Sequence, residues 1–571
     1  MAVIDPATLT VIQRRLKAIT NEMSLSLLRS ARSTILSEAK DFVTALFDAG
    51  GRLLEQTEHI PVLAYALPPA MEQVIRFFGD EIYPGDIILH NDPFTGGNQC
   101  ADVKVIKPVF YQNRLAAWVV ISGHQADIGG GQPGGYNPTA RTIFEEALRI
   151  PPVKLFEAGH LRRDVWGLVF GNVRFDDLVE GDIKAAIGGA TVGERAYIEL
   201  LDAYGHDVLQ QYTQELIAST ERMMRSEIAR IPNGVYRGEA VAFDDGFDPT
   251  AQMPVCLCLT VAGDELTFDY TGTAPQTQGY VNSPLSATLS STMLSLLMCI
   301  DISAIPNNAG RLRPIHIIAP EGTMLNPRFP AATSFGNHLA DQISAAIFQA
   351  LAQAVPDRVT AGWNPTHNAL VVGRDPRRDK PFVDLLFLGA KGGSGALQGH
   401  DGYDHIGSVY TAGGARAQDP EMFEHVNPLL IHRYEYAMDS PGAGRWRGGY
   451  GVRFEMECLA PVDYISVIGD GTVEAARPFG LFGGQPGCLN EIELVYPDGR
   501  RRRAGSKEVI RDVPAGTRWH QTKAGGGGYG DARERSRDQV RLEVRQGLIS
   551  PESAVRDYGL DANFLTDDDT P

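Results

Sequence analysis

Residues 85–131 contain the feature that most restricts how this 571-residue chain can fold. Two apolar runs typical of β-strands, Ile87 to Leu89 and Leu115 to Ile121, each end in a polar, glycine-rich segment. Strands hold the backbone in place, and glycines allow polar side chains and a substrate to approach it closely. The polar residues at these strand ends are His90, Asp92, Asp102, His124 and Asp127. The pattern therefore indicates a functional site built on strand ends.

Imidazole and carboxylate groups dominate this segment, and they are the ligands typical of Zn, Mn or Fe. The same groups also serve general acid–base catalysis. A structural alternative stays open, because residues 91–97 read Asn-Asp-Pro-Phe-Thr-Gly-Gly. Asn and Asp side chains bond their own backbone in turns, so this segment also fits a long β-turn.

Composition excludes several classes of function. The net charge of −18 argues against a nucleic-acid partner, because phosphate neutralisation needs clustered Lys and Arg. The most apolar stretch, Leu289 to Ile300, is too short to span a bilayer and predicts a buried helix, so no membrane partner is expected. Six scattered cysteines and the lack of a leader pattern in Met1 to Thr10 predict a cytoplasmic protein with reduced thiols.

The order of elements predicts a multi-domain α+β fold, with a mixed helix and strand N-terminal catalytic part and a glycine-rich, β-rich C-terminal part. The expected domains are 1–235, which carries the candidate site, a mixed middle domain 236–395, a glycine-rich β domain 396–531 and a helical tail 532–571. The helix that begins after Asp5 has apolar residues in helical spacing, and its continuation is expected to deliver Asp41 to the site.

Glycines lead to two further expectations. Residues 162–204 predict two helices that meet at Gly181-Asp182, since glycine weakens a helix interior. The run Gly525 to Gly528 is expected to be too rich in glycine to pack, and to reach the active site or a partner.

Several ordered motifs resemble those of the B subunits of hydantoinases and 5-oxoprolinases. Residues 91–102 are similar to the family pattern Asn-Asp-Pro-Tyr-x-Gly-Gly-Thr-His-x-x-Asp, and residues 124–130 to His-x-Ala-Asp-Ile-Gly-Gly. Further similar segments, spread over nearly the whole chain, are Lys40 to Val43, His59 to Val62, Arg149 to Leu155, Ala443 to Gly449, Gly480 to Gly484 and Gly525 to Asp531.

The resemblance implies a divalent metal, Zn, Mn or Mg, held by Asp41, Gln99, Asp102 and His124. The family has histidine at position 99, and a carboxamide oxygen binds zinc much more weakly than an imidazole. Three alternatives follow: the site prefers Mg or Mn, His90 substitutes for the missing imidazole, or the metal is absent.

The resemblance also implies catalytic roles. His124 acts on water, Asp127 orients His124, and Glu146 is a general base or hydrogen-bond acceptor in the wall of the substrate pocket. On residue type alone, a carboxylate on a helix surface is the more common case for Glu146.

As a family member, the chain would be the B-type catalytic subunit of an ATP-dependent cyclic-amide hydrolase that opens hydantoin, 5-oxoproline or lactam rings. ATP would be bound by a hydantoinase A-type partner in an α2β2 or larger hetero-oligomer, and the partner would supply a phosphorylated intermediate. One alternative is a subunit of an ATP-dependent ketone carboxylase of the acetone or acetophenone type. Another is a non-catalytic scaffold subunit.

Overall fold

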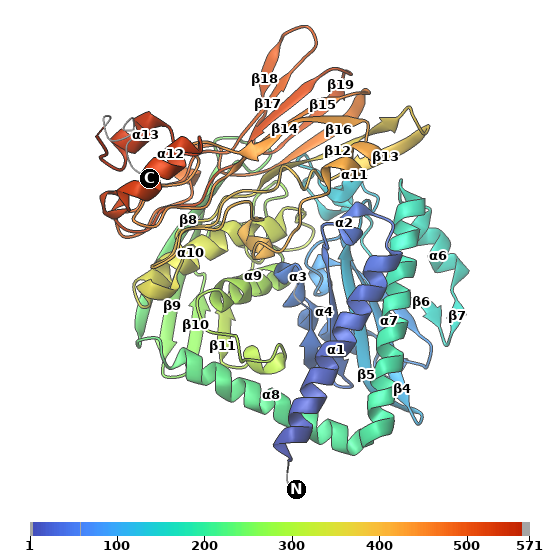
Figure 1. Cartoon of the computed structure of the whole chain (residues 1–571). Coiled ribbons are helices and arrows are strands. Elements are labelled where there is room, and N and C mark those ends of the chain that lie inside the picture. Colours follow the sequence, from blue (N-terminus) through green and yellow to red (C-terminus); the bar gives the residue numbers. More distant parts are fainter. Residues whose placement is uncertain (1–3, 58, 562–571) are drawn as a thin grey trace. The chain divides into compact units, whose positions relative to one another are not determined.

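The structure is a computed structural model that describes residues 4–57 and 59–561, so residues 562–571 of the expected tail lie outside it. The chain forms two compact units. The first comprises residues 1–237 and 256–340, and the second comprises residues 238–255 and 341–571. The first segment of the first unit ends at residue 237, close to the boundary expected after residue 235. The division into four domains stays a prediction. The expected α+β fold is confirmed (Figure 1).

A seven-stranded sheet forms the centre of the first unit, with the strand order β2-β1-β5-β4-β3-β6-β7. Its strands are β1 (Phe42–Asp48), β2 (Leu53–Gln56), β3 (Ile87–His90), β4 (Asp102–Tyr111), β5 (Arg114–His124), β6 (Val153–Glu157) and β7 (His160–Leu161). The helices around it are α1 (Pro6–Ser30), α2 (Thr34–Ser37), α3 (Pro61–Ala64), α4 (Leu67–Phe78), α5 (Ile143–Glu146), α6 (Arg163–Phe170), α7 (Asp176–Tyr204) and α8 (His206–Ile228).

Helices α1 and α7 lie side by side against this sheet (Figure 1). Gly189 makes the close approach possible, because a Cβ there would lie 2.8 Å from Ile121 Cδ1 and 3.0 Å from the Met23 carbonyl oxygen. The expected break at Gly181-Asp182 is wrong, since α7 runs through both residues. Asp182 instead accepts hydrogen bonds from the backbone nitrogens of residues 32 and 33, at 2.6 and 3.1 Å.

A four-stranded sheet, β11-β10-β9-β8, comprises β8 (Gly234–Phe243), β9 (Gln252–Ala262), β10 (Glu265–Asp269) and β11 (Ile315–Ile318). The buried helix expected near Leu289 is confirmed as α9 (Leu285–Leu297), and most of its residues are buried. The 3-10 turn η4 (Gly336–Leu339) and helix α10 (Ala340–Ala352) follow.

The second unit contains two antiparallel sheets, β13-β12-β16-β19 and β14-β15-β20-β17-β18. Their strands are β12 (His367–Asp375), β13 (Lys380–Asp384), β14 (Leu429–Tyr436), β15 (Val452–Cys458), β16 (Val462–Gly469), β17 (Glu491–Val495), β18 (Arg501–Arg503), β19 (Glu508–Val513) and β20 (Arg518–Thr522). Helices α11 (Pro420–Val426), α12 (Arg537–Arg545) and α13 (Pro551–Arg556) complete the unit.

The expectation that Gly525 to Gly528 would not pack is wrong. All four glycines are buried, and Gly526, Gly527 and Gly528 exchange backbone hydrogen bonds with other loops of the second unit. A Cβ on Gly526 would lie 1.8 Å from the Ser394 carbonyl oxygen, and one on Gly527 would lie 1.9 Å from the Phe479 carbonyl oxygen. Glycine is therefore required here because backbones pack directly against each other.

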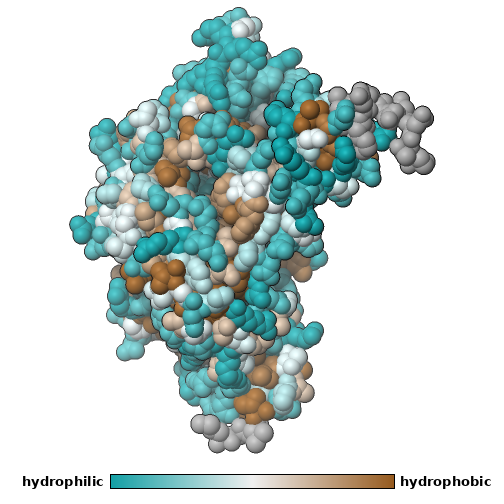
Figure 2. Space-filling view, turned by 90° about the vertical axis from the view of Figure 1, so that its left-hand side faces the viewer, coloured by the Kyte–Doolittle hydropathy of each residue, from teal (hydrophilic) through white to brown (hydrophobic). Residues whose placement is uncertain are grey.

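Figure 2 shows a face on which hydrophilic residues predominate and apolar residues form separate patches. Among the described residues, no helix combines the length and apolar character needed to cross a membrane.

Candidate active site

Three neighbouring strands of the first unit bring the predicted acids and histidine together. Strand β4 begins at Asp102, β5 ends at His124, and these two residues lie directly opposite each other in the antiparallel pair. Asp41 immediately precedes β1, the other neighbour of β5, and its carbonyl oxygen accepts a hydrogen bond of 3.0 Å from the His124 backbone nitrogen. Strand β1 rather than the first helix therefore delivers Asp41, because α1 ends at Ser30.

His124 and Asp102 form a buried hydrogen-bonded pair. The Nδ1 atom of His124 lies 2.8 Å from Oδ1 of Asp102, and the two residues are 3% and 0% exposed. Because a carboxylate only accepts, Nδ1 donates, and Nε2 is the nitrogen that can act on another molecule. This is the arrangement by which an acid orients a catalytic imidazole.

Charges near the pair shift its ionisation. Burial lowers the pKa of His124, but the hydrogen bond and charge of Asp102, together with the charge of Asp41, raise it above its ordinary value. Burial raises the pKa of Asp102. The hydrogen bond and charge of His124, the charge of Lys104 and the hydrogen bond from Asn337 bring this pKa below its ordinary value. Burial raises the pKa of the Asp41 carboxyl to about 7, and the charge of His124 opposes this rise. Asp41 as a whole residue is half-buried. The site therefore strengthens His124 as a base, because Asp102 and Asp41 stabilise the imidazolium that forms when His124 takes a proton.

Two asparagines hold the second oxygen of Asp102. Asn337, on η4, donates from Nδ2 to Oδ2 of Asp102 at 2.9 Å, and Asn98 donates to the same oxygen. Asn337 Nδ2 also lies 3.0 Å from Oε1 of Gln99, whose Nε2 donates to the Ser334 carbonyl oxygen at 2.9 Å. Both polar ends of Gln99 are thus engaged within the protein.

Lys104 and His338 are site residues that the sequence analysis missed. Lys104 is fully buried, donates to Oδ1 of Asn98 at 2.8 Å, and has its pKa lowered to about 8 by burial. Its position two residues after Asp102 in β4 was a usable signal, because alternate residues of a strand share a face. His338 comes from η4, and its Nε2 lies 3.3 Å from the Tyr136 hydroxyl, while the Tyr136 ring stacks on His124. No local sequence signal indicates this long-range contact.

Asp127 does not orient His124 as expected. Its Oδ1 accepts hydrogen bonds from the Gly134 backbone nitrogen at 3.0 Å and from Nη1 of Arg174 at 3.2 Å, and its Oδ2 accepts from the Arg174 backbone nitrogen at 2.6 Å. Asp102 instead takes the orienting role. Asp127 fixes the glycine-rich loop that follows β5.

Glu146 lies inside the protein, so the alternative of a helix-surface carboxylate is wrong. It is 1% exposed and accepts hydrogen bonds from the backbone nitrogens of Thr333 and Ser334 at 2.7 to 2.9 Å. Burial raises its pKa to about 7, against the effect of these donors. Glu146 therefore fixes the segment that leads to Asn337 and His338.

The donor set fits a metal ion poorly. Within the described part of the chain, no three His, Cys, Asp or Glu side chains form a group that could hold one. His124 supplies one imidazole, and both oxygens of Asp102 accept hydrogen bonds from protein groups. His90 bonds Thr95 through Nε2 at 3.0 Å, and burial lowers its pKa to about 3.

The buried Asp–His pair at the strand ends has the chemical groups and the geometry that general acid–base catalysis uses. The chain matches the Hydantoinase B/oxoprolinase family model over residues 5–532. It belongs to this family, as the motifs indicated.

Two relatives match nearly the full chain. The beta subunit of caprolactamase from Pseudomonas jessenii is 36% identical over 582 residues, covering 100% of this chain and 98% of its own. The B subunit of a putative D-/L-hydantoinase from Pseudomonas sp. strain NS671 is 32% identical, covering 98% of this chain and 95% of its own.

Solved structures share the fold. The crystal structure of ATP-dependent caprolactamase from Pseudomonas jessenii matches with a TM-score of 0.91 and 35% identity, covering 98% of this chain and 97% of that one. The nucleotide-free structure of acetone carboxylase matches with a TM-score of 0.89 at 19% identity, covering 98% of this chain and 80% of that one. The second match concerns the fold alone.

Proposed function

We propose that this chain is the B-type catalytic subunit of an ATP-dependent cyclic-amide hydrolase. The observation that carries the proposal is the buried His124–Asp102 pair in a chain 36% identical to one subunit of a caprolactamase. We further propose that ATP is bound by a hydantoinase A-type partner, which transfers a phosphoryl group to the amide oxygen. An unstrained amide is a poor electrophile, and phosphorylation makes its carbon open to attack.

His124 would act as the general base. As water adds to the activated carbon, Nε2 takes a proton, and Asp102 stabilises the imidazolium through Nδ1. The proton then passes to the ring nitrogen. Transfer of the remaining hydroxyl proton to the same nitrogen breaks the carbon–nitrogen bond, which leaves a free amine and an acyl phosphate. A second water releases inorganic phosphate and the open-chain acid.

The network around the pair would support this step. Asn98 and Asn337 hold Asp102 so that Oδ1 faces His124, and Tyr136 fixes the imidazole plane by stacking at 5.7 Å between ring centroids. These contacts hold the His124 imidazole close to the position that general base catalysis requires.

The metal set Asp41, Gln99, Asp102 and His124 stays a prediction, with Zn, Mn or Mg as candidates. Because its donor set fits poorly, no step above depends on a metal. Elemental analysis of the purified complex tests it, and a stoichiometric metal that is lost in His124→Ala would support it.

A ketone carboxylase is the second candidate. Gln99, in place of the family's histidine, favours it, because a carboxylase has no use for a metal-bound hydroxide. The scaffold alternative predicts an unchanged rate in His124→Ala.

One experiment separates these functions. The chain is purified together with its A-type partner, and ATP turnover and products are followed with hydantoins, lactams and ketones, with and without bicarbonate. Ring opening independent of bicarbonate supports the hydrolase. Turnover of ketones that requires bicarbonate supports the carboxylase. If the His124→Ala variant catalyses either reaction at the wild-type rate, the proposed role of the His124–Asp102 pair is refuted.

A further inference from the structure

Lys104 begins a chain of hydrogen bonds that leads to the catalytic pair. The residue is 0% exposed, and its Nζ donates to Oδ1 of Asn98 at 2.8 Å and to the Asp102 carbonyl oxygen at 3.2 Å. The Nδ2 atom of Asn98 donates in turn to Oδ2 of Asp102. Asn98 therefore connects the ammonium to the carboxylate that bonds His124.

The chain continues through two more amides. Nδ2 of Asn98 also donates to Oδ1 of Asn337 at 3.3 Å. Nδ2 of Asn337 donates to Oε1 of Gln99 at 3.0 Å and to Oδ2 of Asp102 at 2.9 Å. The chain ends where Nε2 of Gln99 donates to the Ser334 carbonyl oxygen at 2.9 Å. All of these residues are buried within the first unit.

The two ends of this chain fix its direction. An ammonium has donors only, so Asn98 turns its oxygen toward Lys104 and its nitrogen toward Asp102. A backbone carbonyl has acceptors only, so Gln99 turns its nitrogen toward that end of the chain and its oxygen toward Asn337. An amide turned around at either end would place two donors or two acceptors face to face. Oδ2 of Asp102 is therefore left facing two NH2 groups.

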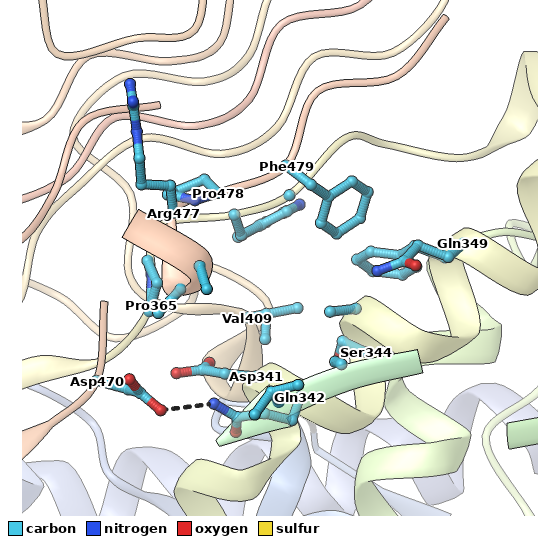
Figure 3. Close-up of a pocket in the computed structure, with 18 of the residues that line it drawn as sticks. Asp341, Gln342, Ser344, Gln349, Pro365, Val409, Asp470, Arg477, Pro478 and Phe479 are labelled. Carbon is cyan, nitrogen blue, oxygen red and sulfur yellow. Dashed lines mark hydrogen bonds between the residues drawn. The ribbon is translucent and has the colours of Figure 1, made fainter. Parts of the chain in front are cut away.

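A buried amide–carboxylate pair in the second unit lacks such an anchor. Beside a cavity of about 200 Å³ in that unit, Nε2 of Gln342 donates to Oδ2 of Asp470 at 3.1 Å (Figure 3). Oε1 of Gln342 has no hydrogen-bond partner among the described residues. Each of the three site amides instead has a partner for both its oxygen and its nitrogen. A fully satisfied polar network is the kind that holds a working group rigidly in place.

We infer that Lys104 is a positioning residue for His124. Through Asn98 it keeps donors on Oδ2 of Asp102, so that Oδ1 is the oxygen that accepts from Nδ1 of His124. The inference rests on the proposed function for the use of His124 as a base. The order of the hydrogen bonds does not depend on that function.

Removal of the ammonium weakens the hold on Asp102. In Lys104→Met, Oδ1 of Asn98 loses its donor at 2.8 Å, and a buried acceptor without a partner is costly. Rotation of the Asn98 amide would only turn this oxygen toward the Asp102 carboxylate. We expect the complex to open its cyclic amide about 10- to 100-fold more slowly. The KM should stay within about threefold, because the loss falls on the step that His124 catalyses.

Asn98→Leu tests whether Lys104 acts through Asn98. It should cause a loss of similar size, and adding Lys104→Met to it should change the rate by no more than about twofold. The double variant replaces both partners by apolar groups, so it should fold even if a single variant does not. Losses that multiply in the double variant, or a wild-type rate in it, would overturn the inference.

The ¹⁵N NMR spectrum of His124 in the full chain separates this inference from the proposed function. Lys104→Met should shift the signal of the protonated Nδ1. The control is Lys154→Met, which replaces a buried lysine of β6 whose Nζ lies 3.0 Å from Asp86, and it should leave the signal in place and the rate within about twofold. A shifted signal with an unchanged rate would support the positioning and count against His124 as the base. An unchanged signal in a folded Lys104→Met chain overturns the inference.

Discussion

Replacement of Asp102 by asparagine tests how the structure sets the protonation of His124. Oδ2 of Asp102 accepts from Asn98 and Asn337, so the amide oxygen of Asp102→Asn will face these two donors. Its NH2 group must then face Nδ1 of His124. That nitrogen becomes the acceptor, the proton moves to Nε2, and the imidazole can no longer take a proton from water.

The expected loss is large. The pair loses a charge-assisted hydrogen bond of about 1.5–3 kcal/mol, and the wrong tautomer adds to this loss. The equivalent change in a serine-protease triad lowers kcat by about 10⁴, so we expect a fall of about 10³- to 10⁴-fold in ring opening by the complex.

The assay measures ATP-dependent ring opening, and ¹⁵N NMR of His124 reports its tautomer. Asp182→Asn is the matched control, because Asp182 is equally buried in the first unit but bonds backbone nitrogens outside the site. A rate within about tenfold of the wild type in Asp102→Asn, with Nε2 protonated, would refute the reasoning.

Three further changes test other parts of the account. Gln99→His should strengthen zinc binding at least about tenfold, measured by chelator competition, and equal affinities would count against the predicted metal set. Burial raises the pKa of Glu146 from 4.5 to about 7, so the folded chain keeps a proton that the unfolded chain has released, and stability falls as the pH rises between these values. Glu146→Gln should remove about 3 kcal/mol of that fall between pH 4.5 and 7, and an unchanged slope of unfolding free energy against pH would exclude this explanation. Gly189→Ala should destabilise the chain by about 1–3 kcal/mol through overpacking, whereas Gly188→Ala, with open space around its Cβ, should stabilise it by about 0.5–1 kcal/mol; thermal unfolding that ranks them in reverse order would contradict the packing.

The sequence predicted the strand ends well, because their polar residues interrupt clear apolar runs. The sequence analysis placed Asp102 in the polar segment after the Ile87–Leu89 run and His124 after the Leu115–Ile121 run. The structure brings the two residues together, but Asp102 begins β4, a strand that was not predicted, and it pairs there with His124 at the end of β5. The register of this antiparallel pair, and not the first apolar run, sets their contact.

Other features depended on tertiary contacts that no local pattern encodes. Asp127 faces Arg174, 47 residues away, and Asp102 meets Asn337, 235 residues away. Gly181 in α7 was read as a break and residues 525–528 as unpacked chain. In the structure Gly181 lies against the Arg32 side chain, and the glycines at 525–528 pack against the backbone of other loops. A glycine gives the same local signal in both cases, and only its neighbours in space distinguish them.

The central claim is that His124 directs water to a carbon already activated by phosphorylation. The most direct measurement is rapid quenching of the complex with its lactam substrate and ³²P-labelled ATP, in wild type and in His124→Ala. We predict that the variant still transfers the phosphoryl group but opens the ring at least about 10³-fold more slowly, so that the phosphorylated lactam accumulates. Ring opening at the wild-type rate in His124→Ala would contradict the claim.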